Sequence, residues 1–229
     1  MKNIKFTNLS GNEFFEHPVP ALKKIPQWYK DTLEYIDNKK SYAKTDSHPQ
    51  TIKKCIPVFD AMTAGYIIST TCDIEVSIKD GFQYFYWGEL GTIDFHPVEQ
   101  APIHPAQNGN PYPKWVNFWS VETPPGYSCL FIDPMHNPNN IFTILPAIVD
   151  TDNYSAPVNF PFVMNDTQWT GIIPAGTPIA QIIPFKRDSW KTEVGKKKDV
   201  DKGFIIIKKL QTFLYNSYKR QFWIRKEYR

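Results

Sequence analysis

Short apolar runs separated by turn residues recur along this chain, and their spacing predicts a body of short β-strands. The clearest example begins at Cys72–Ile78, where apolar and polar residues alternate as they do in a half-buried strand. Lys79–Gly81 has the composition of a tight hairpin turn, and Phe82–Trp87 follows as an aromatic strand. The pattern therefore predicts a two-stranded hairpin over residues 72–87.

The densest succession of apolar runs lies between Pro146 and Arg187, and we expect the rest of the chain to support it. Strands are predicted there at 148–149, 158–163 and 179–185, with turns at 169–171 and 174–176. Elsewhere strands are predicted at 4–7, 62–70, 115–121, 128–132, 141–145 and 190–194, with the dense β region beginning at 55–59.

Two helices are predicted, one near each end. Pro26 suits the first turn of a helix that runs to about Ile36. From about Asp201 to Tyr218 the apolar positions fall at helical spacing, namely Ile206, Leu210, Phe213 and Leu214. Residues 37–50 and 195–198 are polar and charged, and we interpret both as loops or turns.

Composition favours a single β-rich fold with a core. Of the 229 residues 41% are hydrophobic, and 20 prolines against 11 glycines disfavour long helices. We therefore predict a mainly β protein with a short N-terminal helix and a basic C-terminal helix. Its divisions are an N-terminal arm at 1–50, a β-rich core at 51–195 and a basic aromatic tail at 196–229.

The charge of the chain is unevenly distributed. Residues 186–229 carry 14 Lys and Arg against 5 Asp and Glu, whereas residues 1–185 carry 12 against 18. Such a tail would dock to a protein partner, an anionic surface or nucleic acid, or would be a solvated helix. The predicted docking residues are Lys208, Lys209, Arg220, Trp223 and Arg225, and exposed aromatics such as Tyr228 would add anchors.

The cysteines and the N-terminal residues indicate a cytoplasmic protein. Cys55, Cys72 and Cys129 are far apart and form no paired motif, which fits buried thiols in a reducing compartment. The N-terminus lacks the apolar core of a signal peptide, and no apolar run is long enough to span a membrane.

Catalytic and metal-binding motifs are scarce. Nucleotide-binding glycine loops, zinc-protease motifs and calcium loops are absent from the sequence. His96, His104 and His136, with Asp94, Glu99 and Asp133 nearby in sequence, would suit a metal by residue type, but the histidines share no compact motif. We therefore favour loop histidines and predict no metal site.

The most suggestive polar pair is Asp150 and Asp152, which follow a predicted strand at alternate positions. Two carboxylates on one side of a strand end orient a water molecule, hold Mg²⁺ or bind a sugar hydroxyl in many proteins. Asp152 and Asn153 equally suit a turn in which their side chains bond to the backbone. Both interpretations stay open at this point.

This stretch resembles the dUTPase and dCTP-deaminase superfamily. Ile148–Tyr154 is similar to the family's apolar-apolar-Asp-x-Asp-Tyr motif, and Gly176–Gln181 is similar to its Gly-x-x-Ile-Ala-Gln motif. Met62–Tyr66 is similar to the Ala-Gly-Tyr start of a third motif. The resemblance implies a β-clip fold of short strands, assembled as a homotrimer with sites at the subunit interfaces.

The resemblance also implies roles for single residues. Asp150 would orient a water molecule and Asp152 would bind a sugar hydroxyl, as the catalytic pair. Tyr154 would stack on a ring, while Gly176 and Gln181 would line the ligand site. No cofactor is expected, and Mg²⁺ would enter only together with a bound nucleotide.

Several family positions are occupied by other residues. Ile67 stands where the family has Asp, Pro178 stands where it has Arg, and Asn153 is inserted before the tyrosine. Residues 137–143 lack the family's phosphate-binding Arg-Ser, and residues 159–165 lack the deaminase glutamate. The C-terminal Gly-rich motif also has no counterpart, so the contacts that would hold a triphosphate are missing.

A second resemblance spans nearly the whole chain. It is carried by Ile25–Lys30, Thr123–Ser128, Val149–Asp152, Pro157–Phe162 and Gly176–Arg187. These segments are similar to a family of tailed bacteriophages and bacteria that has no assigned activity. The chain would then be a divergent dUTPase-like member of it, located in the host cytoplasm or in the virion if phage-encoded.

Two functions from different classes follow. The favoured one is a non-catalytic oligomeric protein, structural or binding in role, with the trimer as the preferred assembly. The alternative is an enzyme or binding protein for a nucleotide or another small polar ligand, acting through Asp150 and Asp152. Nucleic-acid binding through the tail is a third hypothesis, and it predicts affinity that falls steeply with salt.

Overall fold

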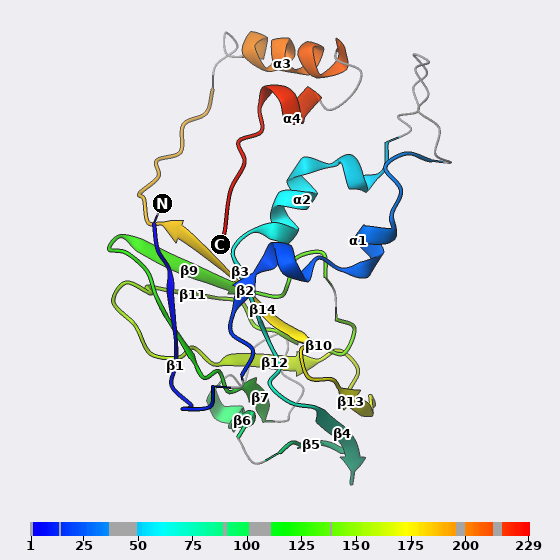
Figure 1. Ribbon diagram of the computed structural model, residues 1–229, viewed down its shortest axis with the longest axis vertical. Helices are drawn as coiled ribbons and strands as arrows, with labels where there is room; N and C mark the ends of the chain where they lie inside the picture. The colour runs from blue at the N-terminus through cyan, green and yellow to red at the C-terminus, as the bar shows by residue number, and fades with distance from the viewer. Residues whose placement is uncertain are drawn as a thin grey trace.

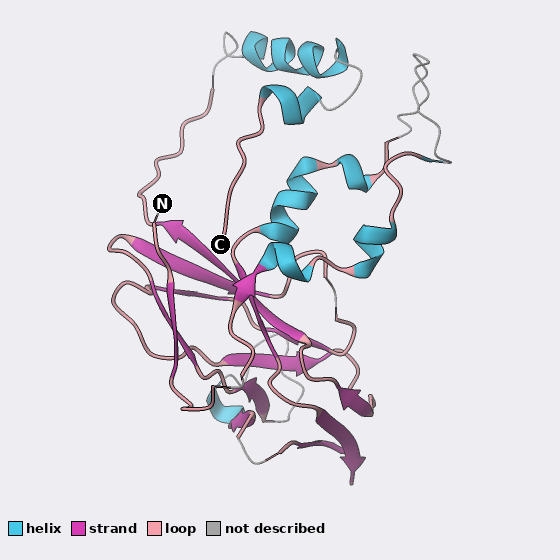
Figure 2. Cartoon of the chain, viewed as in Figure 1, coloured by secondary structure: helices cyan, strands magenta, loops and turns pink. Residues whose placement is uncertain are grey.

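The computed structural model describes residues 2–13, 15–36, 50–88, 91–100, 111–137, 139–195, 200–212 and 217–229. Within these ranges the protein is mainly β, with small antiparallel sheets packed into one body (Figure 2). Two short helices lie beside this body, and two more belong to the C-terminal tail (Figure 1). The predicted fold class is confirmed.

The largest sheet is five-stranded. Its strand order is β11 (Ala147–Val149), β9 (Tyr127–Ile132), β14 (Pro178–Lys186), β3 (Tyr66–Ser69) and β2 (Val19–Pro20). Gly65 precedes β3 with a φ of +69°, and a Cβ there would lie 1.9 Å from the carbonyl oxygen of Ile182. A glycine is therefore required where β3 meets β14.

Three smaller sheets complete the body. The four-stranded sheet has the order β10 (Phe142–Ile144), β12 (Phe160–Met164), β7 (Tyr112–Trp115) and β6 (Ile93–His96). The three-stranded sheet has the order β13 (Gly171–Ile173), β4 (Ile74–Lys79) and β5 (Phe82–Tyr86). β1 (Lys5–Asn8) pairs with β8 (Trp119–Glu122), so residues of the predicted N-terminal arm add strands to the body.

An aromatic core holds the sheets together. The rings of Trp115 and Phe162 stack at a centroid distance of 4.7 Å, and both rings also contact Phe142. These three residues belong to the four-stranded sheet, and the contact between Phe131 on β9 and Phe160 on β12 joins this sheet to the five-stranded one. All five side chains are buried. Aromatic pairs of this kind contribute packing energy beyond the area they bury, which explains how such short strands form a stable body.

The helical segments are short apart from one. They are η1 (Ala21–Lys24), α1 (Gln27–Asp31), η3 (Ile52–Lys54), α2 (Ile56–Thr63), η4 (Val98–Gln100), α3 (Val200–Thr212) and α4 (Ser217–Gln221). Figure 1 shows α3 and α4 together, apart from the β body, with the C-terminal segment returning from α4 to that body. We call α3 and α4 the helical arm.

Several strand predictions are confirmed. The hairpin of β4 and β5 has its turn at Asp80 and Gly81, both with positive φ. β1, β9, β10, β11, β12 and β14 also lie within one or two residues of the predicted ranges. β3 begins at Tyr66, four residues after the predicted start at Met62, because residues 62–63 still belong to α2. The predicted loops at 37–50 and 195–198 lie almost wholly outside the described residues.

Four local predictions are wrong. Residues 56–63 form α2 instead of beginning the β region, because Pro57 suits the first turn of a helix. The predicted strand 115–121 is interrupted at Asn117, whose side chain bonds to the backbone of Trp119 in both directions. Residues 190–194 form no strand, and α1 ends at Asp31 rather than near Ile36 because Thr32 is already extended.

Candidate functional site

Asp150 and Asp152 lie in a tight turn directly after β11. The N–H groups of Asn153 and Tyr154 both donate to the carbonyl oxygen of Asp150, at 2.9 and 2.8 Å. Thr151 between the two acids is fully buried, and its hydroxyl lies 2.7 Å from that of Thr123. These contacts fix the backbone of the turn from inside the body.

Arg187 closes this turn from the end of β14. Its guanidinium donates to both carboxylate oxygens of Asp152, with Nη1 at 2.7 Å from Oδ1. The N–H of Gly126 donates to Oδ2 of the same residue at 2.7 Å. Only 5% of the Asp152 side chain is exposed. Asp152 thus has a bidentate arginine and a backbone donor, which is a strongly satisfied carboxylate.

Asp150 belongs to the same cluster but is more open. The hydroxyl of Ser128 donates to its Oδ1 at 2.6 Å, and Nη1 of Arg187 lies 3.2 Å from the same oxygen. Its side chain is 57% exposed. We call Asp150, Asp152, Arg187 and Ser128 the acid cluster.

The hydrogen bonds of the cluster hold both carboxyl groups in the charged form. The Arg187 hydrogen bond lowers the pKa of Asp152 to about 2. The Ser128 hydrogen bond lowers the pKa of Asp150, and the charge of Arg187 adds to this effect. A general base needs a pKa nearer neutrality, so Asp152 is a weak proton acceptor at pH 7.

The acid cluster does not suit Mg²⁺. The ion requires oxygen ligands in near-octahedral geometry, whereas the cation that these two carboxylates share is the guanidinium of Arg187. A metal between them would have to displace that guanidinium. The described residues also hold no group of three or more His, Cys, Asp or Glu side chains arranged for a metal.

The other predicted ligand residues lie in different surroundings. Tyr154 ends the turn that carries Asp150 and Asp152, and its side chain is exposed. Gly176 lies in the turn between β13 and β14 with a φ of +79°, and its N–H donates to Thr70. Gln181 is completely buried within β14.

The side chain of Gln181 bonds only to this chain's own backbone. Its amide oxygen accepts from the N–H of Met135 at 2.8 Å. Its amide nitrogen donates to the carbonyl oxygens of Ala61 and Ala64 at 2.9 and 2.7 Å. These bonds join the C-terminal end of α2 to β14 and to the turn after β9. The position therefore has a strong structural use.

The described histidines of the predicted set do not gather into a site. His96 ends β6 and contacts Gln100, while Asp94 on the same strand pairs with Lys114 at 2.8 Å. The carbonyl of His136 accepts from the Trp28 indole. His104 lies outside the described residues.

The predicted docking residues are distributed along the tail. Lys208 is exposed on α3, Lys209 belongs to the same helix, and Arg220 is exposed on α4. Arg225 is exposed and pairs with Glu227 at 3.6 Å.

Trp223 is anchored within its own chain. Its indole N–H lies 3.0 Å from both carboxylate oxygens of Asp60, and Lys226 contacts the same carboxylate at 2.6 Å. The ring of Tyr228 meets that of Tyr66 edge-on at 6.0 Å. The residues after α4 are therefore fastened to the body around α2 and β3.

Arg187 is the member of the acid cluster that the sequence patterns did not predict. It follows the apolar strand Ile179–Phe185, and nothing in the sequence shows that the end of this strand meets the turn at Asp150. The pairing of β14 with β9 and of β9 with β11 brings them together. The one local signal was a basic residue at a strand end, which is common on protein surfaces.

The fold and the site define a mainly β protein of small antiparallel sheets with an arginine-closed acid turn. A scan of protein-family models finds no matching family, and no curated protein matches the chain. Among solved structures the chain is similar to a dUTPase from phage phi11 of S. aureus, with 11% identity, 86% of this chain and 99% of that chain covered, and a TM-score of 0.37.

A second similar structure is the dUTPase of Staphylococcus bacteriophage 80alpha with bound dUpNHpp. Here the identity is 12%, the coverage is 85% of this chain and 87% of that chain, and the TM-score is 0.36. The phi11 protein coordinates a structural Mg(II) ion. At TM-scores this low the likeness says nothing about a site or an activity.

Among the helices that the structure describes, none has the length and apolarity that crossing a membrane requires.

Proposed function

We propose that this chain is a non-catalytic, oligomeric protein of structural or binding role, which assembles through its helical arm. The observation that carries the proposal is an exposed apolar run on α3, residues 204–207. All four side chains are exposed, and Phe204 and Ile207, at 58% and 49%, lie one turn apart. A group of exposed large apolar residues favours a binding partner over water.

The closed acid cluster supports the non-catalytic part of the proposal. Asp152 is buried against Arg187, so its two oxygens are already bonded and it has little capacity left to hold a water or a sugar hydroxyl. A bidentate arginine pair of this kind braces a turn in many folds. The cluster then serves to join β14 to the turn after β11.

The distribution of charge supports a second copy of the chain as the partner. The segment that carries the arm has an excess of basic residues, and residues 1–185 have an excess of acidic ones. Opposite charges on the arm and the body favour docking of one copy's arm onto the body of another. The trimer that the family resemblance implies is the preferred assembly.

The test changes the apolar run of the arm and leaves the anchored C-terminal residues intact. Phe204→Ser with Ile207→Ser should convert the assembly of the full chain to monomers, measured by light scattering. The matched control is Ile148→Ser with Ile172→Ser, which removes two exposed isoleucines of the body. Circular dichroism of each variant should show that the body is unchanged.

Each outcome decides something. A wild-type chain that is monomeric at all concentrations would contradict the proposed oligomer. A double arm variant that keeps the molecular mass of the wild-type assembly would show that the arm is not the interface. A chain that assembles only on added duplex DNA or on anionic vesicles, with steep loss in salt, identifies an anionic partner instead.

The alternative, an enzyme or binding protein for a nucleotide or small polar ligand, is favoured by one observation. The carboxylate of Asp150 is charged and largely exposed beside Tyr154. A thermal-shift series with nucleotides and divalent metals tests it, because a ligand of the native state raises the midpoint. A shift that Asp150→Asn abolishes would establish this alternative, and the absence of any shift would remove it.

A further inference from the structure

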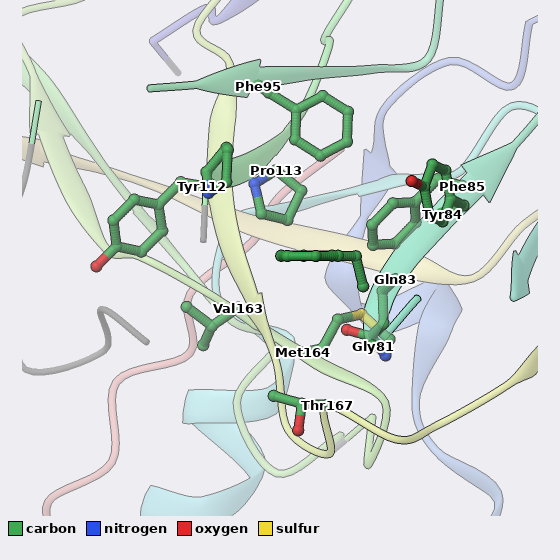
Figure 3. A pocket seen from close by; sticks show the side chains of 12 residues that line it. Gly81, Gln83, Tyr84, Phe85, Phe95, Tyr112, Pro113, Val163, Met164 and Thr167 are labelled. Carbon is green, nitrogen blue, oxygen red and sulfur yellow. The ribbon is translucent and has the colours of Figure 1, made fainter. Parts of the chain in front are cut away.

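β5, β6 and β7 lie at the end of the body opposite the helical arm (Figure 1). A hollow opens between two sheets there (Figure 3). β5 of the three-stranded sheet forms one wall, and β6, β7 and β12 of the four-stranded sheet form the others. Its volume is about 470 Å³. We call it the aromatic pocket, after Phe82, Tyr84, Phe85, Phe95 and Tyr112, which line it.

The side chains converge on the space from different elements. Figure 3 shows Phe95 and Pro113 on one side and Val163, Met164 and Thr167 on the other. Tyr84 and Phe85 close one end. Gly81 lies at the rim, where an added Cβ would meet nothing within 4 Å.

The walls of the pocket are fixed by contacts to the core. The ring of Phe85 meets the buried Phe162 edge-on at 5.8 Å and lies 6.1 Å from Phe95. The amide nitrogen of Gln83 donates to the carbonyl oxygens of Asp166 and Trp169, at 3.2 and 3.1 Å. These bonds tie β5 to the segment after β12, so the pocket does not depend on a ligand to form.

The chemistry of the lining selects an uncharged ligand. Of the described residues that line the pocket, none is acidic or basic. A charged ligand would lose its hydration there without gaining an opposite charge. Ring faces and a methionine next to them instead favour the faces and edges of another ring.

The lining also provides hydrogen-bond acceptors. Both hydrogens of the Gln83 amide nitrogen are used in its bonds to Asp166 and Trp169, so its oxygen remains to accept, and the hydroxyls of Tyr84 and Thr167 belong to the same lining. A ligand with an O–H or N–H group on its ring would match them. Small-molecule sites commonly have this composition, with apolar walls and few polar groups, and volumes of roughly 300–1,000 Å³.

We propose that the aromatic pocket binds a small, uncharged aromatic or heteroaromatic molecule that carries one hydrogen-bond donor. This site is separate from the acid cluster and from the helical arm. Binding at this site is therefore independent of the assembly proposed above, and each proposal can fail without the other.

Four probe molecules test the proposal by saturation-transfer NMR on the full chain. They are 1-naphthol, 1-methoxynaphthalene, 1-naphthoate and cyclohexanol. We expect 1-naphthol to bind best. Loss of the donor in 1-methoxynaphthalene should weaken binding about tenfold, as one hydrogen bond would. The anion and the non-aromatic alcohol should bind more weakly still.

Two variants localise the signal. Thr167→Trp places a large side chain at an exposed position of the lining and should abolish 1-naphthol binding. Ile148→Trp is its matched control, because it adds the same side chain to an exposed position of β11. Phe95→Ala should weaken binding without filling the pocket. Thermal midpoints near that of the wild type show that each variant is folded.

The results that would overturn the proposal are specific. Equal binding of 1-naphthol and cyclohexanol, or binding that survives Thr167→Trp, would show nonspecific adsorption. Stronger binding of 1-naphthoate would place the ligand at a basic site elsewhere. A proline-rich peptide that binds to the pocket, together with no detectable binding of 1-naphthol, would show that the surface is a peptide groove. That result would exclude the small-molecule site.

Discussion

The acid cluster and the aromatic pocket differ in what their side chains have left to bind. In the acid cluster the guanidinium of Arg187 lies 3.2 Å or less from each of the two carboxylates, and the opposite charges satisfy each other. The aromatic pocket has no charge in its described lining, yet its ring faces border open space. Residue type alone therefore does not indicate a binding site. A site is indicated by side chains with unused bonding capacity, and that capacity depends on which other side chains lie next to them.

Gln181 offers the sharpest way to extend this comparison, because it also has a polar side chain that is fully used. Gln181→Leu would leave one N–H and two carbonyl groups without their partner in the interior. We expect the free energy of unfolding to fall by about 2–4 kcal/mol, measured by urea denaturation.

Gln168→Leu is the matched control for this prediction, because Gln168 is exposed. Its effect should stay within about 0.5 kcal/mol. Equal effects of the two variants would show that the Gln181 bonds contribute little to stability. A ligand-binding role would then again be a reason for a glutamine at this position.

Arg187→Met should have the next largest effect. The substitution removes the bidentate partner of the buried Asp152 carboxylate and leaves it backbone N–H donors such as that of Gly126, and a buried charge that loses its counterion is strongly destabilising. A clear fall in Tm is expected by calorimetry. Arg225→Met, which breaks an exposed pair with Glu227, should leave Tm almost unchanged. A stable Arg187→Met protein that gains nucleotide binding would instead reveal a masked site.

The stability of the folded chain should also depend on pH through the carboxyl group of Asp152. Its pKa in the folded state is about 2, below the ordinary value of 3.8, so the unfolded chain takes up the proton first. This contribution to stability is complete above pH 3.8 and is lost as the pH falls through about 2.

Asp152→Asn should remove that part of the acid dependence when Tm is followed from pH 5 down to about pH 2. Asp188→Asn, in an exposed pair with Lys186, is the control and should keep the wild-type slope. If Asp152→Asn and the wild type have parallel profiles, the closure of the acid cluster by Arg187 is not maintained in solution.

The smallest effect is expected at the rim of the aromatic pocket. Tyr84 is exposed on an edge strand, so Tyr84→Ser should change the free energy of unfolding by about 0.5 kcal/mol or less, measured by urea denaturation. A substantially larger loss would mean that the ring is part of the core and is not available to a ligand. The aromatic pocket would then, like the acid cluster, have no side chain free to bind a ligand at this position.

Much of the local structure was predictable because its causes are local. The alternation at residues 72–78 and the Asp80–Gly81 turn define the β4–β5 hairpin without help from the rest of the chain. The amphipathic spacing after Asp201 likewise predicts α3. Errors arose where a side chain redirected the backbone, as Asn117 does between β7 and β8.

The pattern of apolar and polar residues was enough to predict the β-rich class, the hairpin, the helical tail and the two acids of the turn after β11. The partners of those acids come from the tertiary fold, because Arg187 is 35 residues from Asp152 in the chain and reaches it through the pairing of β14 and β9. The tertiary fold also brought β5, β6, β7 and β12 around one hollow. Local patterns follow from neighbouring residues, whereas the bonding state of a side chain depends on contacts between distant segments, which no local pattern encodes.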